Sequence, residues 1–392
     1  MRLLASVGCL AVLTACSPAE LAVRPAAKPE PFSAGRDYFP DKAVVRYARQ
    51  FGVSYHGHYK VIDFDPTVPT RERLQYLLVQ RGTPVPEGYP NAQVVQIPVN
   101  RYIHLHNAYY GLLERFHLLD GLAGISSING VTVPPILEGY RSGRIREAGS
   151  GSHSNIEMAI GLDPEVIFLF YSAYPEYNVH PKLRELGVPA VQLADQFEPT
   201  PLGRAEWMKL IALFFNREAE VNRAFDALES RYEALVQLAE KAGSRPRVLG
   251  GAPSSSQWML FGGRNFQSQL IADAGAEYFW PGDAHQSLLN VSYEIVYDQS
   301  NETDRWLASS GMYYRSIDGL IARDRRLAWF RPVQQRRVFA FDRNADRFRR
   351  IPYANYSLDR PDALLSDLIA VFHPELLPVH NFEFLREVSA AR

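Results

Sequence analysis

A long helical segment in the middle of the chain constrains the fold more than any other feature. From Leu202 to Ala242 the sequence contains no proline and is compatible with helix almost throughout. Apolar side chains recur there alternately at four and three residues, at Val221, Phe225, Leu228, Tyr232, Leu235, Ala239 and Ala242. This spacing predicts one apolar stripe along a helix from Arg217 to Ala242, about 39 Å long, with Asn216 as its N-cap and Gly243 at its end. Because the stripe is not repeated elsewhere, we expect a helix lying across two lobes and not a coiled-coil arm.

Alternating strand and helix patterns flank this helix on both sides. The apolar runs Val166–Ser172 and Ala190–Asp195 before it are continuous, which is typical of strands covered on both faces. After it, the strands Arg247–Ala252 and Arg337–Asp342 alternate with helical segments. The alternation predicts an α/β fold of two lobes with mostly parallel sheets, joined by the long helix. The expected boundaries are 39–215 for the N-terminal lobe, 216–243 for the inter-lobe helix and 244–392 for the C-terminal lobe.

Two local patterns refine the first lobe. The extended runs Tyr59–Asp65 and Tyr76–Gly82 precede the buried run Ala92–Val99, and we expect them to add strands to this lobe. Ser154 and Glu157 match a capping box, in which each side chain satisfies a backbone amide near the other residue. A helix is therefore expected to begin at Ser154.

Both cysteines of the chain lie in its first 16 residues, at Cys9 and Cys16. The apolar stretch Leu3–Leu13 follows one positive charge, at Arg2. This stretch is too short to span a bilayer, but the pattern is typical of a secretory signal. The sequence Leu-Thr-Ala-Cys ending at Cys16 resembles the bacterial lipobox, in which the cysteine is lipidated and becomes the mature N-terminus. We therefore expect a signal peptide over 1–16, lipidation of Cys16 and a proline- and alanine-rich tether over 17–38. An ordinary signal with an incidental cysteine is the alternative.

Composition and motifs disfavour several classes of function. The chain carries 42 Lys and Arg against 43 Asp and Glu, without a basic block, so it offers no footprint for nucleic acid. No cysteine follows Cys16, which excludes disulfides and thiolate metal sites from the body of the protein. No nucleophile-elbow, zinc-protease or phosphate-loop motif is present, which disfavours an enzyme. With 21 tyrosines, 21 phenylalanines and 5 tryptophans, the body suits a cleft that grips a ligand with aromatic rings.

Six phrases in order along the chain resemble one protein family. They are LLERFHLLDGLAGI, SNIEMAIGLDPEVIFLF, GVPAVQL with PLGRAEWMKLIALFFNREAE, FQSQLIADAGAEYFW, LNVSYEIVYDQ and RPDALLSDLIAVFHPEL. From about Ala92 to Leu377 the chain is similar to the periplasmic substrate-binding proteins of iron-siderophore and cobalamin ABC importers, and its third phrase is similar to the iron-complex branch. The usual opening of this family after its first strand is replaced here by NRYIHLHNAYYGLLE. The resemblance implies the class III periplasmic binding protein fold, with two α/β lobes and one long inter-lobe helix.

The same resemblance implies a function in solute import. It implies a monomeric, lipid-anchored protein of the cell envelope, on the periplasmic or extracytoplasmic face of the membrane. There it would capture an iron complex, a ferric siderophore, between its lobes and deliver it to an ABC permease. The resemblance implies no enzymatic activity, no cofactor and no resident metal, and it assigns permease docking to Glu114 and Glu294, one on each lobe. Cobalamin or haem as the ligand stays open, as does a lipid-anchored scaffold without transport.

Ligand contacts are expected in loops at strand ends, where α/β sheets bind their ligands. The candidates are His106, Tyr109, Tyr110, Tyr171, Tyr174 and Tyr177 in the first lobe, and Trp258, Phe261, Arg264, Trp280 and Tyr313 in the second. Aromatic faces can stack on catecholate, corrin or porphyrin rings, and Arg264 can pair with an anionic chelate.

Two His-x-His pairs, His56/His58 and His104/His106, have the spacing of two imidazoles on one face of a strand. A closed zinc site would need further ligands, so we expect these pairs to be coincidental. Haem held by an axial Tyr or His stays an alternative.

Overall fold

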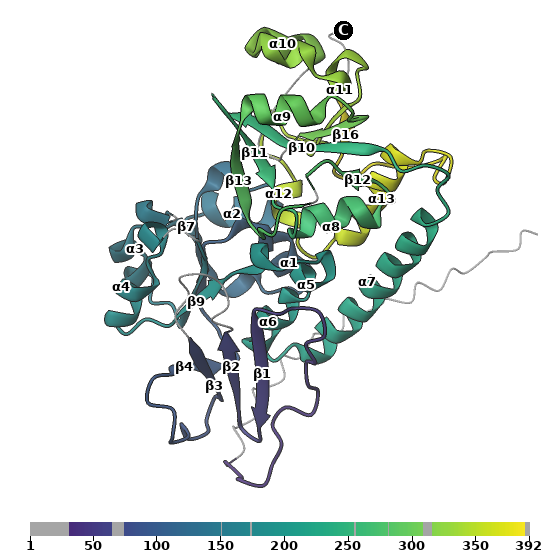
Figure 1. Ribbon diagram of the computed structural model, residues 1–392. Coiled ribbons are helices and arrows are strands. Elements are labelled where there is room, and N and C mark those ends of the chain that lie inside the picture. Colours follow the sequence, from purple (N-terminus) through teal and green to yellow (C-terminus); the bar gives the residue numbers. More distant parts are fainter. Residues whose placement is uncertain are drawn as a thin grey trace, which may run out of the picture.

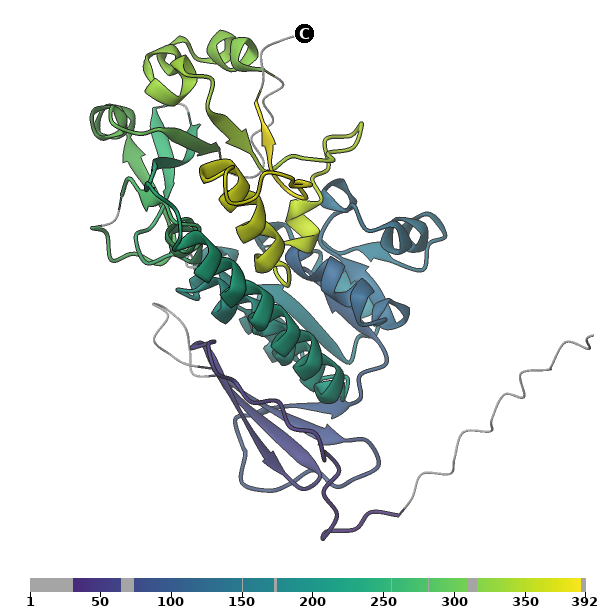
Figure 2. The same ribbon diagram turned by 90° about the vertical axis from the view of Figure 1, so that its right-hand side faces the viewer.

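The structure is a computed structural model that describes residues 31–64, 74–149, 151–172, 175–254, 256–280, 282–308 and 316–388. Three β-sheets lie one above another, and the long helix α7 (Glu218–Ala239) runs alongside them, as Figure 1 and Figure 2 show. Cys16 lies outside the described residues, so its lipidation stays a prediction. Within the described ranges, none of the helices combines the length and the apolar character that crossing a membrane requires.

The sheet of the first lobe is entirely parallel. Its strand order is β7-β6-β5-β8-β9, and the bounds in that order are Arg146–Glu147, Leu122–Ile125, Tyr102–His104, Val166–Phe170 and Ala190–Leu193. The accompanying helices are α1 (Tyr110–Arg115), α2 (Pro134–Arg141), α3 (Ile156–Gly161), α4 (His180–Glu185), α5 (Pro201–Ala205) and α6 (Trp207–Leu213). The central strands are short apolar runs that are buried almost throughout. A strand that is apolar on both sides is stable only in a sheet that has both of its faces covered, as parallel sheets are by their helices.

The sheet of the second lobe is mixed. Its order is β13-β11-β10-β14-β15-β16, and β12 also pairs with β10. The pairs of β10 with β12, β10 with β14 and β14 with β15 are parallel, and the other three pairs are antiparallel. The strand bounds are β10 Arg247–Ser254, β11 Gln257–Phe261, β12 Glu277–Tyr278, β13 Leu288–Ser292, β14 Arg305–Ala308, β15 Val338–Ala340 and β16 Arg386–Glu387. The helices are α8 (Phe266–Asp273), α9 (Tyr293–Ser300), α10 (Ile317–Arg323), α11 (Arg331–Gln334), α12 (Tyr353–Tyr356) and α13 (Pro361–Phe372).

The early extended runs form a sheet of their own, separate from the sheet of the first lobe. Its strands are β1 (Phe51–His56), β2 (Tyr59–Phe64), β3 (Gln75–Gln80) and β4 (Gln93–Ile97), in sequence order. This sheet touches the first lobe at Ala190 in β9, whose carbonyl accepts a 2.5 Å hydrogen bond from the Tyr76 hydroxyl and whose amide donates to Gln93 at 3.0 Å. The predicted strands are therefore present, but they extend the lobe by packing against it and not by joining its sheet.

Two fully buried carboxylates fasten the segment before β1 to the first lobe. Glu206 accepts hydrogen bonds from the backbone amides of Arg46, Tyr47 and Ala48 at 2.7 to 2.9 Å. Glu198 accepts from the amides of Arg49 and Gln50 and from the Trp207 indole, at 2.9 to 3.1 Å. Burial nevertheless dominates at Glu198 and raises its pKa to about 7.

The inter-lobe helix is confirmed, but its predicted ends are wrong. Helix α7 has 22 residues, which corresponds to about 33 Å, and it ends before Gly243. Asn216 is not its N-cap, because this residue has a left-handed backbone (φ 53°) and Arg217 occupies the cap position. The Asn216 side chain instead reaches the N-terminal sheet, where it accepts from Lys60 Nζ at 2.8 Å and donates to Gln80 at 2.8 Å.

The helix predicted to begin at Ser154 has its N-cap one residue later, and the cap is a single side-chain hydrogen bond. Helix α3 is capped by Asn155, whose side chain accepts a 2.8 Å hydrogen bond from the amide of Met158. An asparagine is as good an N-cap as a serine, so the pattern indicated the helix correctly and its first residue wrongly.

The two lobes also meet directly where α12 lies against the 3-10 helix η1 (Asn107–Tyr109) and α1. Asn355 accepts from the Thr132 amide at 2.7 Å, and its side-chain nitrogen donates to the Asn107 carbonyl at 3.2 Å. A Cβ added at Gly111 would lie 2.3 Å from the Tyr356 ring, so only glycine permits this approach. The lobes are therefore in close contact beside the long helix.

Candidate ligand-binding site

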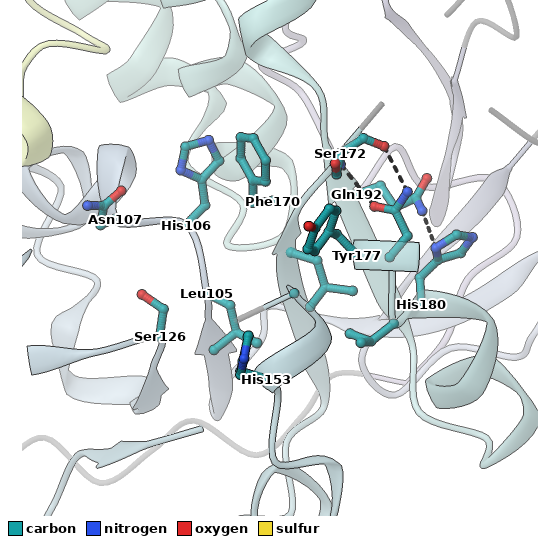
Figure 3. A pocket seen from close by; sticks show the side chains of 14 residues that line it. Leu105, His106, Asn107, Ser126, His153, Phe170, Ser172, Tyr177, His180 and Gln192 are labelled. Carbon is teal, nitrogen blue, oxygen red and sulfur yellow. Dashed lines mark hydrogen bonds between the residues drawn. The ribbon is translucent and has the colours of Figure 1, made fainter. Parts of the chain in front are cut away.

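A pocket opens where the strand order of the first-lobe sheet reverses. The chain passes from β5 to β6 and β7 on one side, and then to β8 and β9 on the other. In open α/β sheets the crevice outside the carboxyl ends at such a reversal is the usual ligand site. Here that crevice is a cavity of about 480 Å³, which Figure 3 shows from close by. Leu105 and His106 follow β5, Ser126 follows β6 and Phe170 ends β8.

The wall of this pocket combines imidazole, amide and hydroxyl groups with open aromatic rings. Its polar lining residues are His106, Asn107, Ser126, His153, Ser172, Tyr177, Asn178, His180 and Gln192. The Phe170 and Tyr177 side chains are 47% and 46% exposed, so both rings are accessible to a ligand. Among the described residues that line the pocket, none is Asp, Glu, Lys or Arg. The described part of the wall therefore offers ring faces and hydrogen-bonding groups, without a carboxylate, an ammonium or a guanidinium group.

His106 is held firmly at the centre of the wall. It is only 8% exposed, and its ring lies 5.0 Å from that of Phe170 in a perpendicular arrangement. Its Nδ1 accepts a 3.4 Å hydrogen bond from the Ala108 amide and so caps η1. Its Nε2 lies 3.1 Å from Asp195 Oδ1, off the line of an ideal hydrogen bond.

Asp195, directly behind His106, is fully buried and has three side-chain partners. The Tyr109 hydroxyl donates to its Oδ1 and Arg204 Nε donates to its Oδ2, each at 3.1 Å. Burial alone would raise the pKa of the Asp195 carboxyl, but His106, Arg204 and Tyr109 favour the charged form and hold that pKa at about 2. The Arg204 guanidinium also lies over the Phe266 ring of α8, 4.6 Å from its centroid, which links this network to the second lobe.

Hydrogen bonds within the wall order the far side of the pocket. The Asn178 side chain accepts from the Ser172 amide at 2.9 Å and donates to the Ser172 carbonyl at 2.8 Å, so the residues after β8 and before α4 are joined here. Gln192 on β9 is hydrogen-bonded to Nδ1 of His180 at the start of α4. The pocket is thus largely preformed before a ligand binds.

Of the predicted ligand contacts that lie in the described ranges, only His106 and Tyr177 line this pocket. The structure instead buries five others in the core: Tyr109, Tyr110, Tyr171, Trp258 and Phe261. Tyr110 donates to the His104 carbonyl and Trp258 to the Gly250 carbonyl, each at 3.0 Å, so their polar atoms are used inside the protein. Exposed Arg264 and half-buried Trp280 do not line this pocket. Tyr174 and Tyr313 lie outside the described residues.

Several pocket residues were not predicted from the sequence. They are Asn107, Ser126, His153, Phe170, Ser172, Asn178, His180 and Gln192. The rule that ligands bind at the carboxyl ends of strands points to Ser126, which follows β6, and to Phe170, which ends β8 within the predicted run Val166–Ser172. Gln192 is a polar residue inside a buried strand, and such a residue is a second indication of a binding site in the sequence.

The two predicted docking residues differ in their surroundings. Glu294 is exposed in the first turn of α9, whereas Glu114 is half-buried at the end of α1 and contacts the second lobe. Their roles toward a permease stay predictions.

Neither His-x-His pair forms a metal site with its neighbours. Burial lowers the pKa of His104 well below its ordinary value, and this ring stacks on Phe168 at 5.2 Å in the core. His56 stacks on Tyr59 at 4.9 Å on the hairpin of the N-terminal sheet. Across the described residues, no group of three or more His, Cys, Asp or Glu side chains is arranged to hold a metal ion.

Comparisons with known proteins agree with this architecture. An uncharacterized lipoprotein of Methanocaldococcus jannaschii is 25% identical over 317 residues, which cover 77% of this chain and 73% of the relative. A periplasmic haem-binding protein from Pseudomonas aeruginosa superposes with a TM-score of 0.58 at 15% identity, over 75% of this chain and 99% of that chain. The Helicobacter pylori protein CeuE, solved with a nickel–histidine complex, gives a TM-score of 0.56 at 14% identity, over 72% and 86%. At these identities the two structures show a likeness of fold alone.

The sequence profile described as periplasmic binding protein matches residues 105–345. This range includes the pocket, the long helix and most of the second-lobe sheet. The N-terminal four-stranded sheet lies outside it. The match covers more than half of the chain, and the chain therefore belongs to the periplasmic binding protein family and is a binding protein, not an enzyme.

Proposed function

We propose that this protein is the lipid-anchored solute-binding component of an ABC importer, and that it captures an iron complex, a ferric siderophore, for delivery to the permease. The observation that carries the proposal is the preformed pocket at the strand reversal of the first-lobe sheet, in a chain of the periplasmic binding protein family. A cavity of about 480 Å³ is of the usual size for a site that binds a small molecule.

The chemistry of the wall supports a chelate as the ligand. The exposed rings of Phe170 and Tyr177 suit stacking on catecholate rings. Amide and hydroxyl groups such as those of Asn107 and Ser126 suit the oxygen atoms at the rim of a ferric chelate. The iron is cargo in this proposal, and its ligands come from the siderophore.

Anchoring and docking complete the proposed role. The lipobox-like sequence ending at Cys16, together with a relative described as a lipoprotein, supports attachment of the N-terminus to a membrane. Glu294 on the second lobe and Glu114 on the first are the proposed contacts to basic groups of the permease, because charge-assisted pairs fix the register of a docked complex.

Calorimetric titration of the unlipidated protein tests the proposal. The chain begins at Ser17, so it lacks both the signal and Cys16, and it is titrated with a ferric catecholate siderophore, a ferric hydroxamate, haem and cobalamin. We expect binding of a ferric siderophore, with a rise in melting temperature, because a ligand at about one hundred times its Kd stabilises the folded state by about 2.7 kcal/mol. The variant Phe170→Ala should lose affinity and the exposed control Val85→Ala should not.

The panel separates the alternatives. Haem and cobalamin are included because solved proteins of similar fold include a periplasmic haem-binding protein and a periplasmic vitamin B12-binding protein. Binding of either one without a ferric siderophore would keep solute capture and replace the ligand. No heat and no shift in melting temperature with any member of the panel would favour a scaffold without transport.

A further inference from the structure

The ring of His106 is fixed by its surroundings, and this limits what it can offer to a ligand. We infer that His106 serves as a flat aromatic wall against a ring of the bound chelate, not as a donor to its metal, and that Asp195 is the residue that positions it. This inference rests on the proposed function, since it names the part of the ligand that the pocket recognises.

Both nitrogens of the imidazole are directed into the protein. Nδ1 faces the Ala108 amide at 3.4 Å, and an amide presents a hydrogen, so Nδ1 must carry the lone pair. Nε2 faces Asp195 Oδ1 at 3.1 Å, where a lone pair would meet the negative carboxylate. The electrostatics therefore assign the proton to Nε2, and neither nitrogen presents a lone pair to the cavity.

The network behind His106 makes this orientation durable. Asp195 is fully buried and charged, and Arg204 and Tyr109 hold its two oxygens in place. Glu198, also fully buried, is a neighbouring carboxyl group, and its pKa is raised chiefly by burial and further by the charge of Asp195. A buried carboxylate that fixes the tautomer and the plane of an imidazole is a positioning group, because rotating the ring would move the Nε2 proton away from the carboxylate oxygen that it faces.

The ring itself is what remains for the ligand. His106 lines the cavity beside Phe170, with the two rings 5.0 Å apart and nearly perpendicular, and Figure 3 shows Phe170 between His106 and Tyr177. The rings of His106, Phe170 and Tyr177 around one cavity favour a ligand that carries an aromatic ring. The pocket is therefore expected to prefer a ferric catecholate to a ferric chelate without aromatic rings.

The first experiment compares two replacements of His106. His106→Phe keeps a ring and removes both nitrogens, whereas His106→Gln keeps polar atoms and removes the ring. Affinity is measured by calorimetry with iron(III)–catecholate and with iron(III)–acetohydroxamate. We expect His106→Phe to stay within about threefold of the original protein for catecholate and His106→Gln to lose about tenfold, since a lost ring–ring contact corresponds to roughly this factor. Equal losses for both variants, or catecholate bound no better than acetohydroxamate, would overturn the inference.

The second experiment tests the role of Asp195. In Asp195→Asn the amide can turn either way toward Nε2, so nitrogen NMR of the imidazole should show a mixture of tautomers, and catecholate affinity should fall. The same substitution in the His106→Phe background should leave affinity unchanged, because there is no imidazole left to position. An equal fall in both backgrounds would mean that Asp195 acts only through stability.

One outcome separates this inference from the proposed function. If the original protein binds neither ferric probe, ferric siderophore capture fails, but the NMR measurement still decides whether Asp195 fixes the tautomer of His106. If nickel or ferric ions without a chelator shift the His106 nitrogen signals at low concentration, the imidazole is a metal donor and the inference is wrong.

Discussion

The Tyr356 hydroxyl donates a 2.8 Å hydrogen bond to the carboxylate of Glu114, and this bond joins the two lobes. Arg115, the next residue of α1, pairs with the buried Asp359 of the second lobe at 2.8 Å. The residue proposed to dock on the permease therefore already has a partner on α12. A basic group of the permease that approaches Glu114 must compete with Tyr356, so docking and the contact between the lobes are coupled at this position.

Removing the hydroxyl should weaken that contact measurably. We expect Tyr356→Phe to lower the free energy of unfolding by about 1 kcal/mol, because a hydrogen bond to a partly exposed carboxylate is lost. Scanning calorimetry measures the change, and hydrogen exchange should show faster opening of α12. The control is Tyr140→Phe, which removes a 3.3 Å bond to Glu147 within the first lobe. Equal exchange of α12 in both variants would show that the Glu114 bond does not join the lobes energetically.

Glu294 allows a cleaner test of docking than Glu114, since it is exposed and lies in the first turn of α9. We expect Glu294→Arg to abolish uptake of the labelled ligand by cells and to leave its affinity for the purified protein unchanged, because only a contact with the permease is reversed in charge. The control is Glu240→Arg, an exposed carboxylate at the end of α7. A loss of ligand affinity in Glu294→Arg would assign this residue to the binding site.

Glu198 should give the protein a characteristic dependence on pH. Burial raises the pKa of this carboxyl from its ordinary 4.5 to about 7 in the folded protein. The folded state then holds a proton that the unfolded state has lost, so the contribution of this group to stability is complete below pH 4.5 and is lost as pH rises through 7. The difference is about 3 kcal/mol in order of magnitude.

Urea unfolding across this range checks the expectation. In Glu198→Gln, which cannot ionise, the fall in stability between pH 5 and pH 8 should be smaller than in the original protein by an amount of that order. Glu138→Gln, with a side chain that is 72% exposed, serves as the control and should follow the original protein. An unchanged slope in Glu198→Gln would mean that its ionisation does not differ between the folded and unfolded states.

A buried ion pair fastens the N-terminal sheet to the start of α7. Lys60 is fully buried, pairs with Glu218 and donates to the Leu213 carbonyl at 2.7 Å. Burial lowers the pKa of Lys60 to about 8, although Glu218 favours its charged form. We expect Lys60→Met to lower the free energy of unfolding by about 3 to 5 kcal/mol, because it leaves the Glu218 carboxylate buried without a cation. In the double variant with Glu218→Gln, urea unfolding should show part of this loss restored, and no restoration would contradict the pairing.

The sequence predicted the large elements well, because they depend on periodic patterns. One apolar stripe was enough to place α7, since a helix that packs along one side repeats its contacts every three or four residues. The parallel sheet of the first lobe followed from continuous apolar strands separated by helices. Both predictions concern many residues at once, so an error at one position does not change them.

Individual contacts depended on directions that the pattern does not give. Phe170 and Tyr171 are neighbours at the end of β8, and successive side chains of an extended segment point to opposite faces. Phe170 faces the pocket, whereas Tyr171 is buried against Phe197. Tyr109, at the end of η1, is buried, and its hydroxyl donates to Asp195 inside the protein. The contact between His106 and Asp195 joins residues far apart in sequence, and no local spacing indicates it.

The rigidity of α7 has a consequence for the rate at which this protein works. The described chain crosses from the first lobe to the second only through this continuous helix, which contains no hinge loop, and polar contacts between α1 and α12 hold the lobes together beside it. Association with a ligand should therefore be a single second-order step that is not preceded by a slow closure. The number of ligands captured per second then depends on the concentration of the solute and the number of protein molecules, and the lifetime of each complex is set by the walls of the pocket.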